Sequence, residues 1–116
     1  MQPSSIAQVR PAEFDAWRAG SGAAQPVVLD VRETWETQTA AVRPLGFSVV
    51  AIPMNEIPAR LAELDPDAPI ACLCHHGARS QRVAAFLAQN GFEKVVNIAG
   101  GIDAWALEQD ASVPRY

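Results

Sequence analysis

The stretch "PIACLCHHGARSQRVAAFLAQNG", residues 69–91, decides the fold. Residues 69–74 form a continuous apolar run, which is typical of a strand buried on both faces of a parallel sheet. Residues 80–91 predict a helix that ends at Gly91, with one apolar face made of Val83, Ala84, Phe86 and Leu87. A short polar loop joins the two, so the stretch predicts a strand, a loop and a helix that packs back on the sheet.

Short apolar runs and helical patterns alternate along the rest of the chain. Strands are predicted at residues 26–31, 47–53 and 94–98, with a short edge strand at 7–9, and helices at 11–20, 33–38, 55–64 and 100–109. The helix at 55–64 is expected to be amphipathic, with Ile57, Leu61 and Leu64 on its buried face. Strands that alternate with helices of this length require crossover connections and therefore run parallel. The sequence predicts an α/β fold, a three-layer domain with a mostly parallel central sheet of about five strands and helices on both faces.

Composition excludes several classes of protein. The 116 residues, 49% of them apolar, suit a single domain over 1–116. The net charge of −4 gives no basic face for nucleic acid, and no apolar run approaches the about 18 residues of a membrane span. The start of the chain does not resemble a signal peptide, so the cytoplasm is the expected location. The 2 cysteines form no disulfide framework and are expected to be free thiols there.

Cys74 stands where the predicted strand 69–74 ends. Ligands of parallel sheets bind at this edge, and the N–H groups of the following loop and helix start would meet there. Such donors stabilise a thiolate, which is the reactive form of cysteine. Gly77 permits a tight loop, and Arg79, His75 and His76 add positive charge. The sequence therefore predicts that Cys74 is a nucleophile in an anion-binding loop.

Other interpretations of the same side chains are simpler. Cys72 lies inside the strand and is expected in the core, and Cys74 could likewise be a structural cysteine. A zinc site built from both cysteines with His75 and His76 is not expected, because adjacent residues of a strand and loop point apart and no second ligand pair exists. The two histidines either modulate the local field or act as general bases.

Four separate stretches resemble the rhodanese-like domain family. They are "VLDVRETWE" (28–36), "IPMNEI" (52–57), "CLCHHGARSQRVAAFL" (72–87) and "NGFEKVVNIAGGIDAWA" (90–106). The resemblance implies a sulfurtransferase: Cys74 would take a sulfane sulfur from a donor such as thiosulfate or a persulfide. The Cys74 persulfide would then pass that sulfur to a thiol or to cyanide. This chemistry implies no metal and no organic cofactor.

The resemblance also implies which residues form the site. The donor would be bound by the loop and helix start, namely His75, His76, Gly77, Ala78, Arg79 and Ser80. Asp30 and Arg32, near the end of their own strand, are expected to support the loop. The expected partners are a small anionic sulfur donor or a protein persulfide, and a thiol acceptor on a small molecule or a protein, without nucleic acid or membrane.

One segment departs from the family pattern. The Gly-His pair that the family commonly shows between "VRETWE" and "IPM" is absent, so the resemblance predicts no path for residues 38–48.

Two other functions fit a cysteine in such a loop. A cysteine phosphatase or arsenate reductase would need a loop one residue longer than the four residues between Cys74 and Arg79, so that the arginine could clamp a tetrahedral oxyanion. A non-catalytic interaction module with this fold would have no need of Cys74, Gly77 and Arg79 together.

Overall fold

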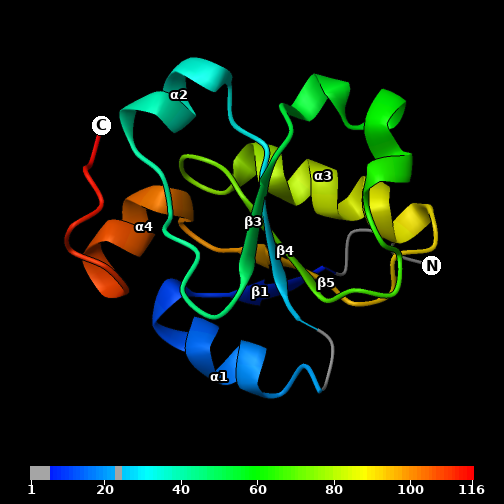
Figure 1. Cartoon of the computed structure of the whole chain (residues 1–116), viewed down its shortest axis with the longest axis horizontal. Coiled ribbons are helices and arrows are strands. Elements are labelled where there is room, and N and C mark those ends of the chain that lie inside the picture. The colour runs from blue at the N-terminus through cyan, green and yellow to red at the C-terminus, as the bar shows by residue number, and fades with distance from the viewer. Residues whose placement is uncertain (1–5, 23–24) are drawn as a thin grey trace.

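Five parallel strands form one sheet in the order β1-β5-β4-β2-β3, in a computed structural model that describes residues 6–22 and 25–116 (Figure 1). The strands are β1 (Ala7–Val9), β2 (Val27–Asp30), β3 (Ser48–Ala51), β4 (Ile70–Leu73) and β5 (Val95–Ile98). Asp30 pairs in register with Leu73 of β4 and with Ala51 of β3. The carboxyl ends of these strands therefore meet at one edge, where Cys74 follows β4. The predicted α/β architecture is confirmed.

Within residues 6–22 and 25–116, four α-helices and three 3-10 helices surround the sheet. The α-helices are α1 (Phe14–Ala19), α2 (Thr34–Thr39), α3 (Ala78–Gln89) and α4 (Gly101–Glu108), and the 3-10 helices are η1 (Pro11–Glu13), η2 (Met54–Glu56) and η3 (Pro58–Glu63). Figure 1 shows α4 on one side of the strands and α3 with η2 and η3 on the other. None of the helices in the described ranges is both long and apolar enough to cross a membrane.

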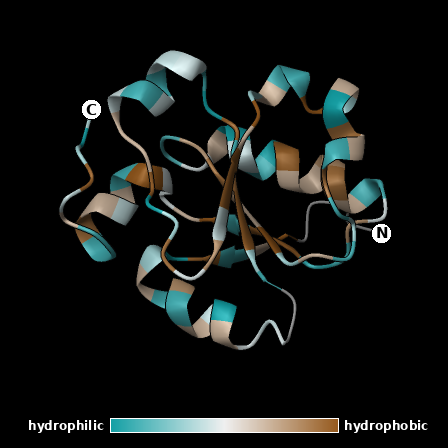
Figure 2. Ribbon diagram, in the orientation of Figure 1, coloured by the Kyte–Doolittle hydropathy of each residue, from teal (hydrophilic) through white to brown (hydrophobic). Residues whose placement is uncertain are grey.

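The sheet separates two hydrophobic cores. One contains Phe14 and Trp105, from α1 and α4, together with alternate residues of the strands. The other contains Val83 and Leu87 of α3 with Ile57 and Cys72. Both faces of the strands are therefore covered, which explains their continuous apolar runs (Figure 2).

Two predicted helices differ from the structure. Residues 55–64 were expected to form one amphipathic helix, but they lie in the 3-10 helices η2 and η3, with a kink at Arg60 (φ −114°, ψ 16°). Pro58 lacks the N–H that a continuous α-helix through this region would use. The segment 11–20 likewise begins with the 3-10 turn η1 before α1. Ile57 and Leu64 still face the core as their spacing predicted.

The structure supplies the path of residues 38–48, for which the resemblance gave none. Ala40, Val42 and Phe47 are buried in the core that contains Phe14. Gly46 turns the chain with φ 83° before β3 begins. The segment is thus held on the core by Ala40 and Val42, two residues apart, and by Phe47, which follows the turn at Gly46.

Candidate active site

Cys74 is held at the carboxyl end of β4 under a loop that turns back on its sulfur. Its side chain is buried, and Sγ accepts hydrogen bonds from the N–H of Gly77 at 3.0 Å and from the hydroxyl of Ser80 at 3.2 Å. Gly77 is the N-cap of α3 and has φ 110°, a conformation that glycine adopts without steric cost. Donors aimed at one sulfur from a helix start stabilise negative charge on it.

The start of α4 closes the loop from its other side. Ile102 donates its N–H to the carbonyl of Cys74 at 2.9 Å, and Asp103 donates to the carbonyl of His75 at 3.2 Å. A Cβ on Gly101 would lie 2.3 Å from the His75 carbonyl oxygen and 2.5 Å from that of Cys74. Only glycine permits this approach, so Gly101 is part of the site although its side chain contributes no chemistry.

A buried polar network continues from Ser80 away from the sulfur. Its hydroxyl lies 2.5 Å from Oδ1 of Asn97, whose Nδ2 donates to the carbonyl of Gly77 at 3.2 Å and to Gln8 at 2.9 Å. A hydroxyl has one proton to donate and can also accept. Ser80 can therefore donate to a Cys74 thiolate, or accept from a Cys74 thiol while donating to Asn97.

Arg79, the predicted oxyanion-binding residue, forms an ion pair with Glu36. Its two terminal nitrogens donate to the two carboxylate oxygens at 2.7 and 2.8 Å. Glu36 is buried and also accepts from the N–H of Glu33 and the hydroxyl of Tyr116. The Arg79 hydrogen bonds lower the pKa of Glu36 to about 2, and the carboxylate raises the pKa of Arg79. The contact of Arg79 with a donor stays a prediction, and such a donor would share the guanidinium with Glu36.

Asp30 and Arg32 form a second, deeper pair at the end of β2. The buried Arg32 donates to both carboxylate oxygens of Asp30, at 2.8 and 2.6 Å, and to the carbonyls of Glu36 and Ala40. It also donates to the Tyr116 hydroxyl at 3.0 Å. These two residues therefore fix α2 on the sheet, and their contact with the Cys74 loop runs through Glu36 and Tyr116.

The two loop histidines differ in their surroundings. His76 is exposed, whereas the His75 ring is sandwiched between His76 and Tyr116, with 3.9 Å between ring centroids on each side. The ring of Tyr116 is nearly parallel to that of His75, at 7°. Nε2 of His75 is buried and has no hydrogen-bond partner within the part of the chain that the structure describes.

The structure brings these histidines close to Asp103. One ligand atom from each of His75, His76 and Asp103 lies within 4.8 Å of the others. However, the Asp103 carboxylate accepts from Arg115 at 2.9 Å, and stacked imidazoles aim their nitrogens side by side instead of at a common point. We therefore assign no metal to this cluster.

Cys72 lies in the core, as its place within the strand predicted. It is buried in β4 beside Ile70 and Val83. Burial, with a smaller contribution from the neighbouring Cys74, raises its pKa to about 12. Cys72 is thus a neutral thiol at physiological pH, and Cys74 is the cysteine at which loop donors converge.

Sequence reasoning missed three residues of this arrangement. Glu36 and Asn97 stand inside stretches that carry the family resemblance, but a carboxylate and an amide there gave no indication of their partners. Tyr116 lies outside every matched stretch, and only the folded chain brings it against His75.

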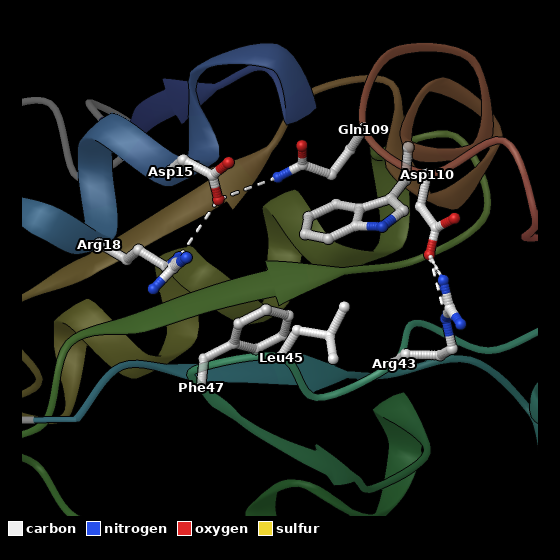
Figure 3. A pocket seen from close by; sticks show the side chains of 8 residues that line it. Asp15, Arg18, Arg43, Leu45, Phe47, Gln109 and Asp110 are labelled. Atoms are coloured by element: carbon white, nitrogen blue, oxygen red, sulfur yellow. Dashed lines mark hydrogen bonds and ion pairs between the residues drawn. The ribbon is translucent and has the colours of Figure 1, made fainter.

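A cavity lies away from the loop, between α1, α4 and the segment before β3. It has a volume of about 330 Å³ and is lined by Asp15, Arg18, Arg43, Leu45, Phe47, Trp105, Gln109 and Asp110 (Figure 3). Each of its charged side chains is already paired, Arg18 with Asp15 and Arg43 with Asp110. Because no lining charge is left for a ligand and no cysteine or histidine faces it, the loop at Cys74 is the candidate active site.

Comparison with known proteins identifies relatives of this chain. A protein of Arabidopsis thaliana named rhodanese-like/PpiC domain-containing protein 12, chloroplastic, is 38% identical over 93 residues, which cover 77% of this chain and 30% of that protein. A sulfurtransferase of Allochromatium vinosum is 44% identical over 55 residues, covering 47% of this chain and 51% of that one. The chain thus spans about half or less of the length of these curated relatives.

Solved structures show the same fold. The crystal structure of a rhodanese-related protein from Thermoplasma volcanium superposes with a TM-score of 0.73 at 28% identity, covering 90% of this chain and 94% of that one. A rhodanese-like domain protein from Staphylococcus aureus gives 0.73 at 26% identity, with 96% and 99% covered. The family model for the rhodanese-like domain matches residues 11–108. The chain therefore belongs to the rhodanese-like domain family.

Proposed function

We propose that this chain is a sulfurtransferase in which Cys74 carries sulfur as a persulfide. The observation that supports this most directly is the pair of donors, the Gly77 N–H and the Ser80 hydroxyl, at 3.0 and 3.2 Å from the Cys74 sulfur. Membership in the rhodanese-like family and the sulfurtransferase named among its relatives support the same reaction class.

The first half-reaction moves sulfur onto the chain. The Cys74 thiolate attacks the outer sulfur of thiosulfate, an S–S bond forms to Cys74, and the S–S bond of thiosulfate breaks with release of sulfite. With a persulfide donor, the leaving group is the donor thiolate instead. The product is a Cys74 persulfide anion, whose charge the same loop donors can stabilise.

The second half-reaction removes the sulfur. A thiolate or cyanide attacks the outer sulfur of the persulfide, the S–S bond breaks toward Cys74, and the Cys74 thiolate returns. The acceptor leaves as a persulfide or as thiocyanate. No net oxidation occurs, and Cys74 requires only a reducing compartment such as the cytoplasm, where its thiol stays free.

The ion pair of Arg79 favours sulfur transfer over phosphate chemistry. A phosphatase of this kind needs the loop arginine to grip a tetrahedral oxyanion with two hydrogen bonds. Here both terminal nitrogens of Arg79 are already bound to Glu36, at 2.7 and 2.8 Å. The short loop and this pairing together leave no free clamp for phosphate.

Intact-mass measurement after incubation with thiosulfate, and separately with glutathione persulfide, tests the proposal. Wild type and Cys72→Ser are expected to gain one sulfur, about 32 Da, that a thiol reductant removes. Cys74→Ser is expected to gain none, and this matched pair separates the two cysteines. If wild type gained no sulfur from either donor, sulfur transfer would be wrong and phosphate-ester hydrolysis would be the next assay.

A further inference from the structure

We propose that Tyr116 is a positioning residue for Cys74, holding the active-site loop in its reactive arrangement through a stacking contact and a hydroxyl bridge. One test of this role, the rate of sulfur transfer, rests on the proposed function. The other test, the rate at which Cys74 is alkylated, does not. Tyr116 is half-buried and comes from a segment that carries no part of the family resemblance.

The ring of Tyr116 restrains the first residue of the loop. It stacks on the His75 imidazole with centroids 3.9 Å apart and planes 7° apart, and it meets Trp35 of α2 edge-on at 6.0 Å. His75 directly follows Cys74 in the chain, so a free His75 side chain would loosen the backbone that carries the sulfur. Offset stacking of aromatic rings stabilises a contact beyond the burial of its area.

The hydroxyl of Tyr116 joins the two ion pairs beside the loop. It donates to Oε1 of Glu36 at 2.8 Å and accepts from Arg32 at 3.0 Å. Glu36 in turn binds Arg79, which lies in the first turn of α3, next to the Gly77 N–H that donates to Cys74. The hydroxyl therefore acts on the sulfur through Glu36 and the start of α3.

These two contacts can be separated by substitution. Tyr116→Phe keeps the ring on His75 and removes the bridge, whereas Tyr116→Leu removes both. Leu107→Ala is the matched control, because Leu107 is an exposed side chain of α4 (64%) outside the network. The chain contains one tyrosine and two histidines, so NMR signals of these rings can be assigned with few variants.

The first measurement is the rate of Cys74 alkylation by iodoacetamide in a Cys72→Ala background, together with persulfide transfer to a thiol. We expect Tyr116→Phe to slow both reactions by about threefold and Tyr116→Leu to slow them by about tenfold. The Leu107→Ala control should match wild type. The ring-current shift of His75 should persist in Tyr116→Phe and vanish in Tyr116→Leu.

A double-mutant cycle with Glu36→Gln distinguishes positioning from a general loss of structure. If the hydroxyl acts through Glu36, the roughly threefold effect of Tyr116→Phe on the alkylation rate should disappear in the Glu36→Gln background. Thermal unfolding of each variant reports whether the chain is folded, and Tyr116→Phe serves as the interpretable variant if Tyr116→Leu does not fold.

The outcomes separate this inference from the proposed function. Slower alkylation and a coupled cycle in a chain that accepts no sulfur would uphold the positioning role while sulfur transfer failed. Wild-type alkylation and transfer rates in folded Tyr116→Phe and Tyr116→Leu would overturn the positioning role, as would an effect of Tyr116→Phe that is unchanged by Glu36→Gln.

Discussion

Arg79 and Glu36, which are 43 positions apart in the sequence, form an ion pair through both terminal nitrogens and both carboxylate oxygens. The pair holds the first turn of α3 against α2, and so fixes the end of the Cys74 loop that leads into α3. The arginine that the loop pattern indicated as a ligand for the donor is therefore also a structural element of the loop.

Replacing Glu36 with glutamine should destabilise the fold. The amide cannot accept from Arg79 at both positions, and breaking one side of a largely buried pair costs about 3 kcal/mol. Urea unfolding at neutral pH measures this change. Glu63→Gln, which alters an exposed pair with Arg60, should leave the unfolding midpoint unchanged, and an equal loss in both variants would contradict a special role for Glu36.

Acid should weaken the fold through the same carboxylate. The folded pKa of Glu36 is lowered to about 2, below its usual value of 4.5, so its stabilising contribution is present above pH 4.5 and lost as pH falls toward 2. The free energy of unfolding of wild type should therefore decrease over this range by more than that of Glu36→Gln. Parallel curves for the two proteins, measured by urea titration at several pH values, would show that another group dominates.

Gly101→Ala should disturb the site more than the same change elsewhere. Its new Cβ would come within 2.3 Å of the His75 carbonyl oxygen, which must move. Gly91→Ala is the matched control, because Gly91 also has positive φ (90°) but nothing lies within 4 Å of its Cβ position. We expect Gly91→Ala to cost about 1 kcal/mol of stability from backbone strain alone, and Gly101→Ala to cost more and to slow Cys74 alkylation. Similar losses in both, with normal Cys74 reactivity, would mean that α4 does not support the loop.

Ser80→Ala should slow sulfur transfer by about tenfold, because it removes a hydroxyl that donates to the charged sulfur and takes the Ser80 contact away from Oδ1 of Asn97. Steady-state transfer from thiosulfate to cyanide provides the rate. Ser112→Ala, at an exposed serine bonded to Asp110, is expected to behave as wild type. An unchanged rate in folded Ser80→Ala would leave the Gly77 N–H as the donor that matters.

Local pattern was sufficient for most of the fold. The strands predicted at 26–31, 69–74 and 94–98 became β2, β4 and β5, because their mainly apolar and β-branched side chains are buried whichever strands lie beside them. The prediction was wrong at 55–64, where Pro58 and a kink at Arg60 divide the apolar pattern between two 3-10 helices. Hydrophobic spacing there identified the buried face correctly but not the type of helix.

The sequence by itself determined that Cys74, the proposed nucleophile, stands at the end of a buried strand. A cysteine at the end of a buried strand, followed by Gly77 and a helix start, meets backbone donors whatever the rest of the chain does, because strand ends and helix starts create them locally. Only the tertiary structure decided the partners of the surrounding charges. Glu36, Arg79 and Tyr116 meet across separations of 43 and 80 positions, and pairing over such distances depends on how α2 and the segment after α4 dock, which no local periodicity encodes.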